Sequence, residues 1–288
     1  MISEPALDRL SAMFQGPDVS GTRYTLISVL GRGGMGVVYL ARDTVLDREV
    51  ALKIVERPHD EANEARILAR LEHPGIVPVH DFGELPDGRL FYAMKRVRGD
   101  RLDRWMASGR ELTERLHVFL RVCDAVAFAH AQGVIHRDLK PENVMIGEFG
   151  EVLVLDWGVA QEMQNAKGRL QIAGTPAYMA PEQARGDAAV DHRADIFSLG
   201  AMLEAIAGTA PVLAIARKAR ADDPAARYQD VPALSADVGR FLAGRAVEAH
   251  RERLVDRLAR FYRRYRLPIL LVLTYLIARV LLLWLARV

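Results

Sequence analysis

The chain has 288 residues, half of them apolar and 26% charged, which is typical of a globular protein with ample core. Its net charge of +2 is unevenly spread: the 44 residues from Arg245 onward carry ten Arg against three acidic residues, which leaves residues 1–244 with about −5. An acidic body argues against nucleic-acid binding, the single cysteine, Cys123, excludes an intramolecular disulfide, and the N-terminus has no apolar stretch typical of a signal peptide.

The pattern of apolar residues predicts a strand-rich part followed by a helical part. A polar lead-in with a short helix covers residues 1–22. Strands are predicted for YTLISVLG (24–31), VVYLARD (37–43), REVALKIV (48–55), GIVPVHDFG (75–83) and RLFYAMKRV (89–97), with one helix over 60–72. Two long amphipathic helices follow, over 112–132 and 193–208, the first ending at Gly133. We therefore predict an α+β chain with a β-rich lobe, residues 23–96, and a helical lobe, residues 97–244.

The segment GVIHRDLKPENVMIG, residues 133–147, gathers charged and amide side chains between two apolar pairs. Val134-Ile135 and Val144-Met145 predict short buried strands, so the polar residues between them are expected on a loop held at both ends. A loop held in this way fixes catalytic groups in space. Asp138 is a candidate to accept a proton from an attacking hydroxyl.

Glycines recur at Gly31, Gly33 and Gly36 in GRGGMGVV, between two predicted strands. Glycine permits positive φ and lets backbone N–H groups approach phosphate oxygens. A G-x-G-x-x-G pattern also occurs in dinucleotide-binding folds, but there a helix follows the loop. The β-branched VVYLARD predicts a strand instead, which favours a phosphate-covering hairpin, or a plain glycine-rich hairpin, over a dinucleotide site.

Lys53 lies inside the apolar strand VALKIV and therefore needs a counter-charge. The helix that begins near Asp60 offers Glu64, whereas the alternative is a surface lysine beside a solvated helical acid. Asp156 follows the apolar run VLVL, and its carboxylate together with the amide of Asn143 provides the oxygen ligands that Mg²⁺ prefers.

Six motifs in this order resemble bacterial Ser/Thr protein kinases of the eukaryotic-like (Hanks) type, over roughly residues 24–244. They are GRGGMGVV, VALK, HRDLKPEN, VLVLDWG, GTPAYMAPE and DHRADIFSLG, with DWG in place of the commoner DFG. The resemblance implies a bilobal protein-kinase fold that transfers the γ-phosphate of ATP to Ser or Thr hydroxyls of proteins, with Mg²⁺ or Mn²⁺ as the metal. The lysine of HRDLKPEN and the threonine of GTPAY favour Ser/Thr over Tyr as acceptor.

The resemblance also implies a role for each matching residue. The implied ATP-binding residues are Gly31, Arg32, Gly33, Gly34, Gly36, Val38, Ala51, Lys53, Met94, Met145 and Asp156. The implied catalytic residues are the base Asp138, Lys140 on the γ-phosphate, and Lys53 paired with Glu64, and the implied metal ligands are Asn143 and Asp156. Met94 is the expected gatekeeper and residues 95–97 the hinge to adenine. The implied structural contacts are a Glu182–Arg227 pair, Asp195 bracing the HRD turn, and Thr175 beside Asp138 and Lys140.

Three departures from the family pattern stand out. Lys53 and Glu64 are closer in sequence than the corresponding residues usually are in the family, so we expect the start of the helix that carries Glu64 to be shortened. EAIAG, residues 204–208, meets TAPVLAIARKA almost directly, so a loop and a helix that contribute to substrate docking are missing. The loop VAQEMQNAKGRLQIA, residues 159–173, contains no Ser, Thr or Tyr, so no phosphoacceptor is available there to pair with Arg137.

The C-terminal run LPILLVLTYLIARVLLLWLA, residues 267–286, is long enough to cross ~30 Å of hydrocarbon as a helix and contains one charge, Arg279. The preceding residues 245–266 form a basic amphipathic segment ending in RFYRRYR, a flank that stays cytoplasmic. We therefore expect a single-pass protein of the cell membrane with a cytoplasmic kinase domain. The alternative is a hydrophobic helix that docks on the body or on a second copy.

The main functional hypothesis is an active membrane-anchored Ser/Thr kinase with protein substrates and self-association for autophosphorylation. A kinase-fold scaffold with weak or no activity is the second hypothesis, and a small-molecule kinase is the third. Inactive relatives usually lose the residue corresponding to Lys53, Asp138 or Asp156, and all three are present here.

Overall fold

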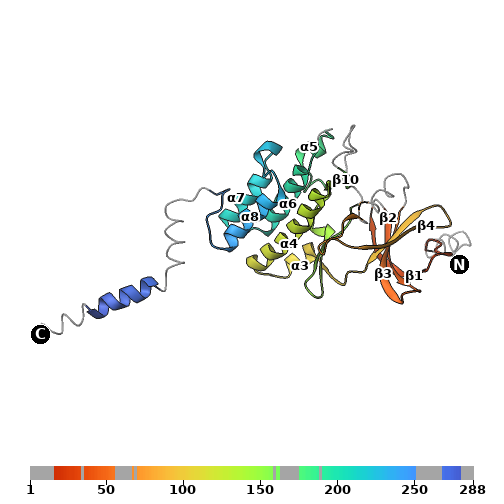
Figure 1. The fold of residues 1–288 in the computed structure, drawn as a ribbon, viewed down its shortest axis with the longest axis horizontal. Helices are drawn as coiled ribbons and strands as arrows, with labels where there is room; N and C mark the ends of the chain where they lie inside the picture. The colour runs from red at the N-terminus through yellow and green to blue at the C-terminus, as the bar shows by residue number, and fades with distance from the viewer. Residues whose placement is uncertain are drawn as a thin grey trace, which may run out of the picture.

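The computed structural model describes residues 16–33, 36–55, 67, 70–157, 160–162, 175–187, 190–250 and 268–279. These residues form a β-rich lobe and a larger helical lobe, as the sequence predicts (Figure 1). The predicted lead-in helix lies outside the described residues. Of the helix predicted over 60–72, only Ile67 and Arg70 are described as helical.

The β-rich lobe is a five-stranded antiparallel sheet in the order β1-β2-β3-β5-β4. Its strands are β1 (Tyr24–Gly33), β2 (Gly36–Asp43), β3 (Arg48–Val55), β4 (Val79–Glu84) and β5 (Leu90–Lys95). Strand β3 lies at the centre, and all its residues from Val50 to Val55 are buried, as its run of apolar and β-branched residues predicts. This burial also encloses Lys53 in the strand.

The strand predicted over 75–83 is shorter than expected, because it begins only at Val79. Pro78 has no N–H to donate to a strand ladder, so it only accepts, through its carbonyl, from the N–H of Lys95, and the strand begins after it. Ile76 instead forms a single parallel bridge to Val154 of the helical lobe, and the N–H of Val77 bonds to the carbonyl of Val154. This segment therefore ties the two lobes together.

The helical lobe is built around α4 and α6. Its helices are α3 (Leu102–Ala107), α4 (Leu112–Ala131), α5 (Pro181–Ala184), α6 (Arg193–Ile206), α7 (Ala210–Ala219) and α8 (Val231–Leu242). Helix α4 presents an apolar face to the core and is followed by Gly133, whose φ of 76° ends the helix. Helix α6 is buried along nearly its whole length, so it forms the central element of this lobe.

Short strands hold the loops that face the β-rich lobe. They are β6 (Gly99–Arg101), β7 (Val134–Ile135), β8 (Val144–Gly147), β9 (Val152–Val154) and β10 (Gln161–Glu162). Strands β6, β8 and β9 form one antiparallel sheet, and β7 pairs with β10. Strands β7 and β8 are the two apolar flanks of the HRDLKPEN loop. The predicted burial is confirmed for Val134, Ile135 and Val144, whereas Met145 is partly exposed.

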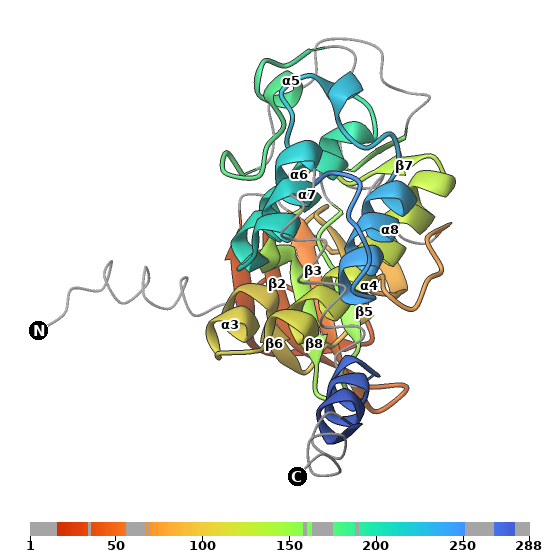
Figure 2. The same ribbon diagram turned by 90° about the vertical axis from the view of Figure 1, so that its left-hand side faces the viewer.

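The connection after α6, where the sequence predicts a shortened helical lobe, is brief. Helix α6 ends at Ile206 and α7 begins at Ala210, so the two helices pack directly against each other (Figure 2). A Cβ at Gly200 of α6 would lie 2.7 Å from Cβ of Ala219, so only glycine permits this approach. Arg220, just after α7, lies 5.4 Å from the ring centre of Phe197. The short connection 207–209 therefore joins two helices that pack directly on each other.

A separate helix covers residues 268–279 and stands away from both lobes (Figure 1). Its apolar side chains are exposed on every side, with Leu271 72% and Ile277 59% exposed. The alternative of a helix docked on the body or on a second copy stays a prediction. Within the described part of the chain, no helix has the length and apolar character needed to cross a bilayer. Residues 267 and 280–286 of the predicted span lie outside the described residues.

Candidate active site

The glycines lie where β1 and β2 pair antiparallel, as predicted, and a strand rather than a helix follows them. The dinucleotide alternative is therefore excluded. A Cβ at Gly36 would lie 2.2 Å from the carbonyl oxygen of Ile54 in β3, and Gly36 has φ 144°. Gly36 thus serves the packing of β2 on β3 as well as the loop. A Cβ at Gly31 or Gly33 would meet no atom within 4 Å, so the space beside the hairpin is open, and Gly34 lies outside the described residues.

Further predicted ATP-binding residues lie on strands of both lobes. Val38 of β2 is paired with Lys53 of β3, and Ala51 of β3 is paired with Met94 of β5. Met145 comes from β8 of the helical lobe. Ala51 is buried, and the other three apolar side chains are partly exposed. Arg32, at the hairpin tip, is exposed. Small and apolar residues therefore line the two sides of the predicted nucleotide site.

Lys53 is 5% exposed, and its Nζ lies 3.0 Å from Oδ1 of Asp156. This ion pair joins the β-rich lobe to the segment after β9, and the sequence did not predict it. Glu64, the predicted partner of Lys53, lies outside the described residues, so that pair stays a prediction. The Lys53 ammonium also lies 5.5 Å from the ring centre of Tyr92, which belongs to the neighbouring strand β5. The lysine is therefore a buried, paired cation and not a surface group.

Asp156 has a left-handed backbone with φ 57°, an uncommon conformation for a residue other than glycine that typically marks functional segments. Burial by itself raises the pKa of this carboxyl, but the charge of Lys53, its hydrogen bond and the charge of Lys140 together outweigh burial. The pKa of Asp156 therefore lies below its ordinary value of 3.8. The group is ionised at neutral pH and remains so in mild acid, as a metal ligand requires.

Asp138 is surrounded by donors on both carboxylate oxygens. Its Oδ1 accepts from the backbone N–H of Thr175 at 2.9 Å and from the Thr175 hydroxyl at 3.1 Å. Its Oδ2 accepts from Lys140 Nζ at 2.7 Å and from Asn143 Nδ2 at 3.2 Å. Lys140 also reaches the Thr175 hydroxyl at 2.7 Å. The expected meeting of Thr175, Asp138 and Lys140 is therefore confirmed.

Asn143 and Asp156 are held side by side by the backbone. The N–H of Leu155, next to Asp156, bonds to the carbonyl of Asn143 at 2.8 Å. The Nδ2 group of Asn143 is used by Asp138, since it also donates to the Asp138 carbonyl at 2.9 Å, which leaves the amide oxygen as the available ligand atom. An amide oxygen and a carboxylate are hard donors that suit a divalent cation such as Mg²⁺. The described residues contain no cluster of three or more His, Cys, Asp or Glu with metal-binding geometry.

Asp195 braces the turn that carries Asp138, as predicted. It is fully buried, and its two oxygens accept from the backbone N–H groups of His136 and Arg137, each at 2.8 Å. His130 Nε2 lies 2.8 Å from the same carboxylate. Burial raises the pKa of Asp195, but these hydrogen bonds and the nearby histidines lower it by more. The net pKa is therefore below the ordinary value of 3.8. The resulting stabilisation is present above pH 4 and is lost as pH falls through that lowered pKa.

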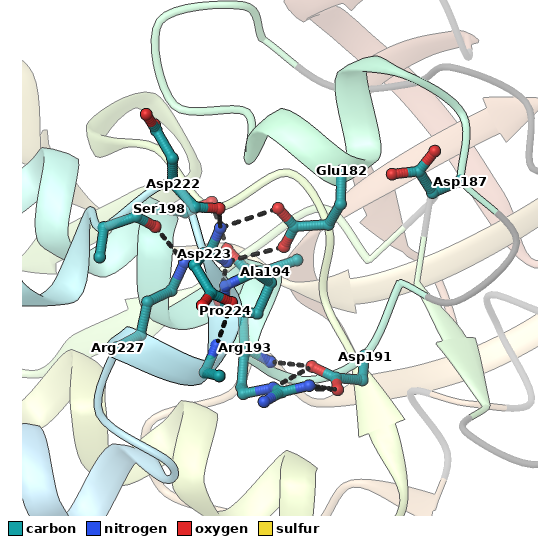
Figure 3. A network of polar contacts seen from close by, with 12 residues as sticks. Glu182, Asp187, Asp191, Arg193, Ala194, Ser198, Asp222, Asp223, Pro224 and Arg227 are labelled. Atoms are coloured by element: carbon teal, nitrogen blue, oxygen red, sulfur yellow. Dashed lines mark hydrogen bonds and ion pairs between the residues drawn. The ribbon is translucent and has the colours of Figure 1, made fainter.

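The Glu182–Arg227 pair is bidentate and buried, and it holds the end of the activation segment, which runs from Asp156 to Glu182 (Figure 3). Arg227 donates to the two oxygens of Glu182 at 2.7 and 2.8 Å, and the guanidinium is fully enclosed. Its remaining N–H groups reach the carbonyls of Ala221, Arg193 and Asp222. Every donor of the guanidinium is therefore satisfied, which is the condition under which a buried ion pair is well held.

One buried contact in this region escaped prediction. Gln183, 2% exposed, donates through Nε2 to the backbone carbonyl of Arg137 at 2.6 Å. The sequence offered one signal, an amide side chain directly after Glu182. The partner is a backbone atom 46 residues away, so no side-chain pattern identifies it.

Residues 24–253 match the protein kinase domain family. Ser/Thr-protein kinase PknD of Chlamydia caviae is 33% identical over a 293-residue alignment that covers 77% of this chain and 31% of that protein. The DNA damage-responsive Ser/Thr-protein kinase RqkA of Deinococcus radiodurans is 39% identical, covering 66% and 30%. PrkC of Bacillus subtilis, a Ser/Thr-protein kinase, is 36% identical, covering 69% and 32%. The chain therefore spans about a third of the length of these relatives. Because this match covers most of the chain and the kinase motifs lie in one site, the chain belongs to the protein kinase domain family.

Proposed function

We propose that the chain is an ATP-dependent Ser/Thr protein kinase that acts on protein substrates. The observation that carries the proposal is the shared contact of Asp138, Lys140 and Thr175, next to the ion pair between buried Lys53 and Asp156. A scaffold under no selection for catalysis has no need of a buried lysine and a donor-lined carboxylate held in register. The named relatives are Ser/Thr protein kinases, which supports the same choice.

The residues divide the work of phosphoryl transfer. Lys53 binds phosphate oxygens of ATP, and the open glycine hairpin covers them. Asp138 orients the acceptor hydroxyl and takes its proton, while Lys140 neutralises charge on the transferred group. Asn143 and Asp156 hold a divalent metal, which we propose to be Mg²⁺, and which neutralises phosphate charge when bound. Positioning and charge neutralisation supply most of the rate enhancement in this reaction.

The deciding experiment compares residues 1–266 with the same protein carrying Asp138→Asn. Each is incubated with radiolabelled ATP, Mg²⁺ or Mn²⁺, and a mixture of basic proteins. We expect label in protein with the native sequence and at least ~100-fold less with Asp138→Asn, because the base is lost while its shape is kept. ATP binding, followed by thermal shift, is expected in both. ATP binding without label in either protein would favour the scaffold.

We also propose that residues 267–286 anchor the chain in a membrane, with the kinase domain in the cytoplasm. The support is the exposed apolar surface of residues 268–279, together with the Arg-rich flank at 260–266. An apolar helix with no contact to the body needs a non-aqueous environment or a partner to cover it. Tethering would also raise the local concentration of neighbouring copies and so favour autophosphorylation between them.

Deletion of residues 267–288 is expected to move the protein from the membrane fraction to the soluble fraction without changing its affinity for ATP, because the nucleotide site lies wholly in the two lobes. Fractionation of cell lysates, followed by ATP titration of the purified forms, makes the comparison. Full-length protein that stays in the supernatant at physiological salt without detergent would contradict the anchor.

Activity is expected not to require phosphorylation of residues 159–173, since that loop has no hydroxyl side chain. Enzyme treated with phosphatase should keep its initial rate. Thr175→Ala should lose most of the rate, because its hydroxyl contacts both Asp138 and Lys140. Continuous assays with and without phosphatase pretreatment measure the effect. A lag that appears after treatment and is removed by preincubation with ATP would show that a phosphate is needed.

A further inference from the structure

The turn that carries Asp138 is strained and is held from several sides. Arg137 has φ 70°, a left-handed conformation that costs about 1–3 kcal/mol for a residue other than glycine. Such a conformation persists only where the surroundings impose it. The N–H groups of His136 and Arg137 are held by Asp195, as described above. These contacts constrain the chain before Arg137 but not the peptide group that follows it.

The peptide group between Arg137 and Asp138 is held on both of its sides. Its carbonyl accepts from Gln183 Nε2 at 2.6 Å, and its N–H donates to His136 Nδ1 at 3.3 Å. The shorter of these two contacts comes from outside the turn. Since this peptide plane sets the direction in which the Asp138 side chain leaves the backbone, the donor on Gln183 bears directly on where the carboxylate lies.

Gln183 belongs to α5, the short helix at the end of the activation segment. Its neighbour Glu182 makes the buried bidentate pair with Arg227. The position of α5 is therefore set by the helical lobe. The hydrogen bond from Gln183 in turn fixes the catalytic turn relative to α5. The contact is buried, since Gln183 is 2% exposed, so water cannot readily replace the amide as donor.

We propose that Gln183 is a positioning residue for Asp138 and that it couples docking of α5 to the geometry of the catalytic turn. In kinases regulated by phosphorylation, a loop phosphate links the activation segment to this turn through the arginine before the catalytic aspartate. The loop 159–173 offers no site for such a phosphate. An uncharged hydrogen bond from Gln183 to the backbone of Arg137 makes a permanent link between the same two segments. The inference rests on the proposed kinase function.

The test uses full-length protein in mild detergent with three variants. Gln183→Met keeps the length of the side chain but removes the donor, and Gln183→Glu replaces the donor with an acceptor. Arg185→Gln is the matched control: it alters the same segment at an exposed ion pair with Asp187. For each protein, kcat and KM for ATP, the affinity for ATP in the absence of turnover, and the melting temperature are measured.

Both Gln183 variants are expected to lower kcat roughly 10- to 100-fold, because a displacement of about 1 Å at a reacting group has an effect of that order. KM and affinity for ATP should stay within about twofold of wild type, since the nucleotide residues are untouched. Arg185→Gln should match wild type in all four measurements. A split between kcat and ATP binding is the signature of positioning, which a general loss of structure does not produce.

Two results would overturn the inference. One is a kcat of Gln183→Met equal to that of the wild-type enzyme, in an assay in which the wild-type enzyme is active. The other is parallel loss of ATP affinity and melting temperature in both Gln183 variants, which would make the residue a structural one. An inactive wild-type protein that still binds ATP would count against the proposed kinase function itself, and this outcome is read before any variant is compared.

Discussion

Lys53→Met is expected to lower phosphoryl transfer by at least ~100-fold while the protein stays folded, because it removes one preorganised positive charge from the phosphate site. The methionine side chain is similar in length and suits the buried position, since Lys53 is 5% exposed within β3. The substitution also leaves Asp156 without its cation. Burial then acts on that carboxyl with less opposition, so its pKa rises and metal binding weakens. Initial rates at saturating ATP and metal measure the loss.

The control for this variant is Arg42→Met in the adjacent strand β2. Arg42 is half exposed and pairs with Asp47 in the hairpin turn, so its loss removes a cation from the same sheet without touching the site. We expect unchanged rates for Arg42→Met and circular dichroism spectra that match wild type for both variants. Turnover of Lys53→Met at the wild-type rate would remove the role assigned to the Lys53–Asp156 pair.

Arg227→Met is expected to destabilise the helical lobe by about 3–5 kcal/mol, because it leaves the carboxylate of Glu182 buried and without its partner. Arg227 is 3% exposed and satisfies five acceptors, among them three backbone carbonyls that would also lose a donor. For a domain of this size the corresponding fall in melting temperature is on the order of 10 °C. Urea unfolding at constant m-value gives the free energy directly.

Two further variants separate the buried charge from a general packing defect. Adding Glu182→Leu to Arg227→Met removes the uncompensated carboxylate, and the double variant is expected to recover part of the lost stability. Arg185→Gln, which breaks an exposed ion pair on the same segment, should change the free energy of unfolding by less than about 0.5 kcal/mol. A loss below about 1 kcal/mol in Arg227→Met would show that the pair is not a structural anchor.

The candidate catalytic and metal-binding residues could be predicted from the sequence, because they occur in short motifs in a fixed order. Asp138, Lys140 and Asn143 lie within six consecutive positions, so a loop of fixed length between β7 and β8 brings them together without further information. Strands and helices followed from apolar periodicity, which local backbone preference and burial both support. The bounds were less exact where a single residue overrides the pattern, as Pro78 does at the start of β4.

The two-lobe order, its strands and helices, and the groups available for phosphoryl transfer could be predicted from the sequence, because each depends on residues near one another in the chain. Which distant atoms meet depends on the packing of the folded chain. Lys53 reaches Asp156 across 103 positions, Gln183 reaches the Arg137 carbonyl across 46, and Gly36 is required by the backbone of Ile54. Two of these contacts end on backbone atoms, which every residue carries. Which backbone atoms they meet depends on how the elements within each lobe pack, and no pattern of side chains along the chain encodes it.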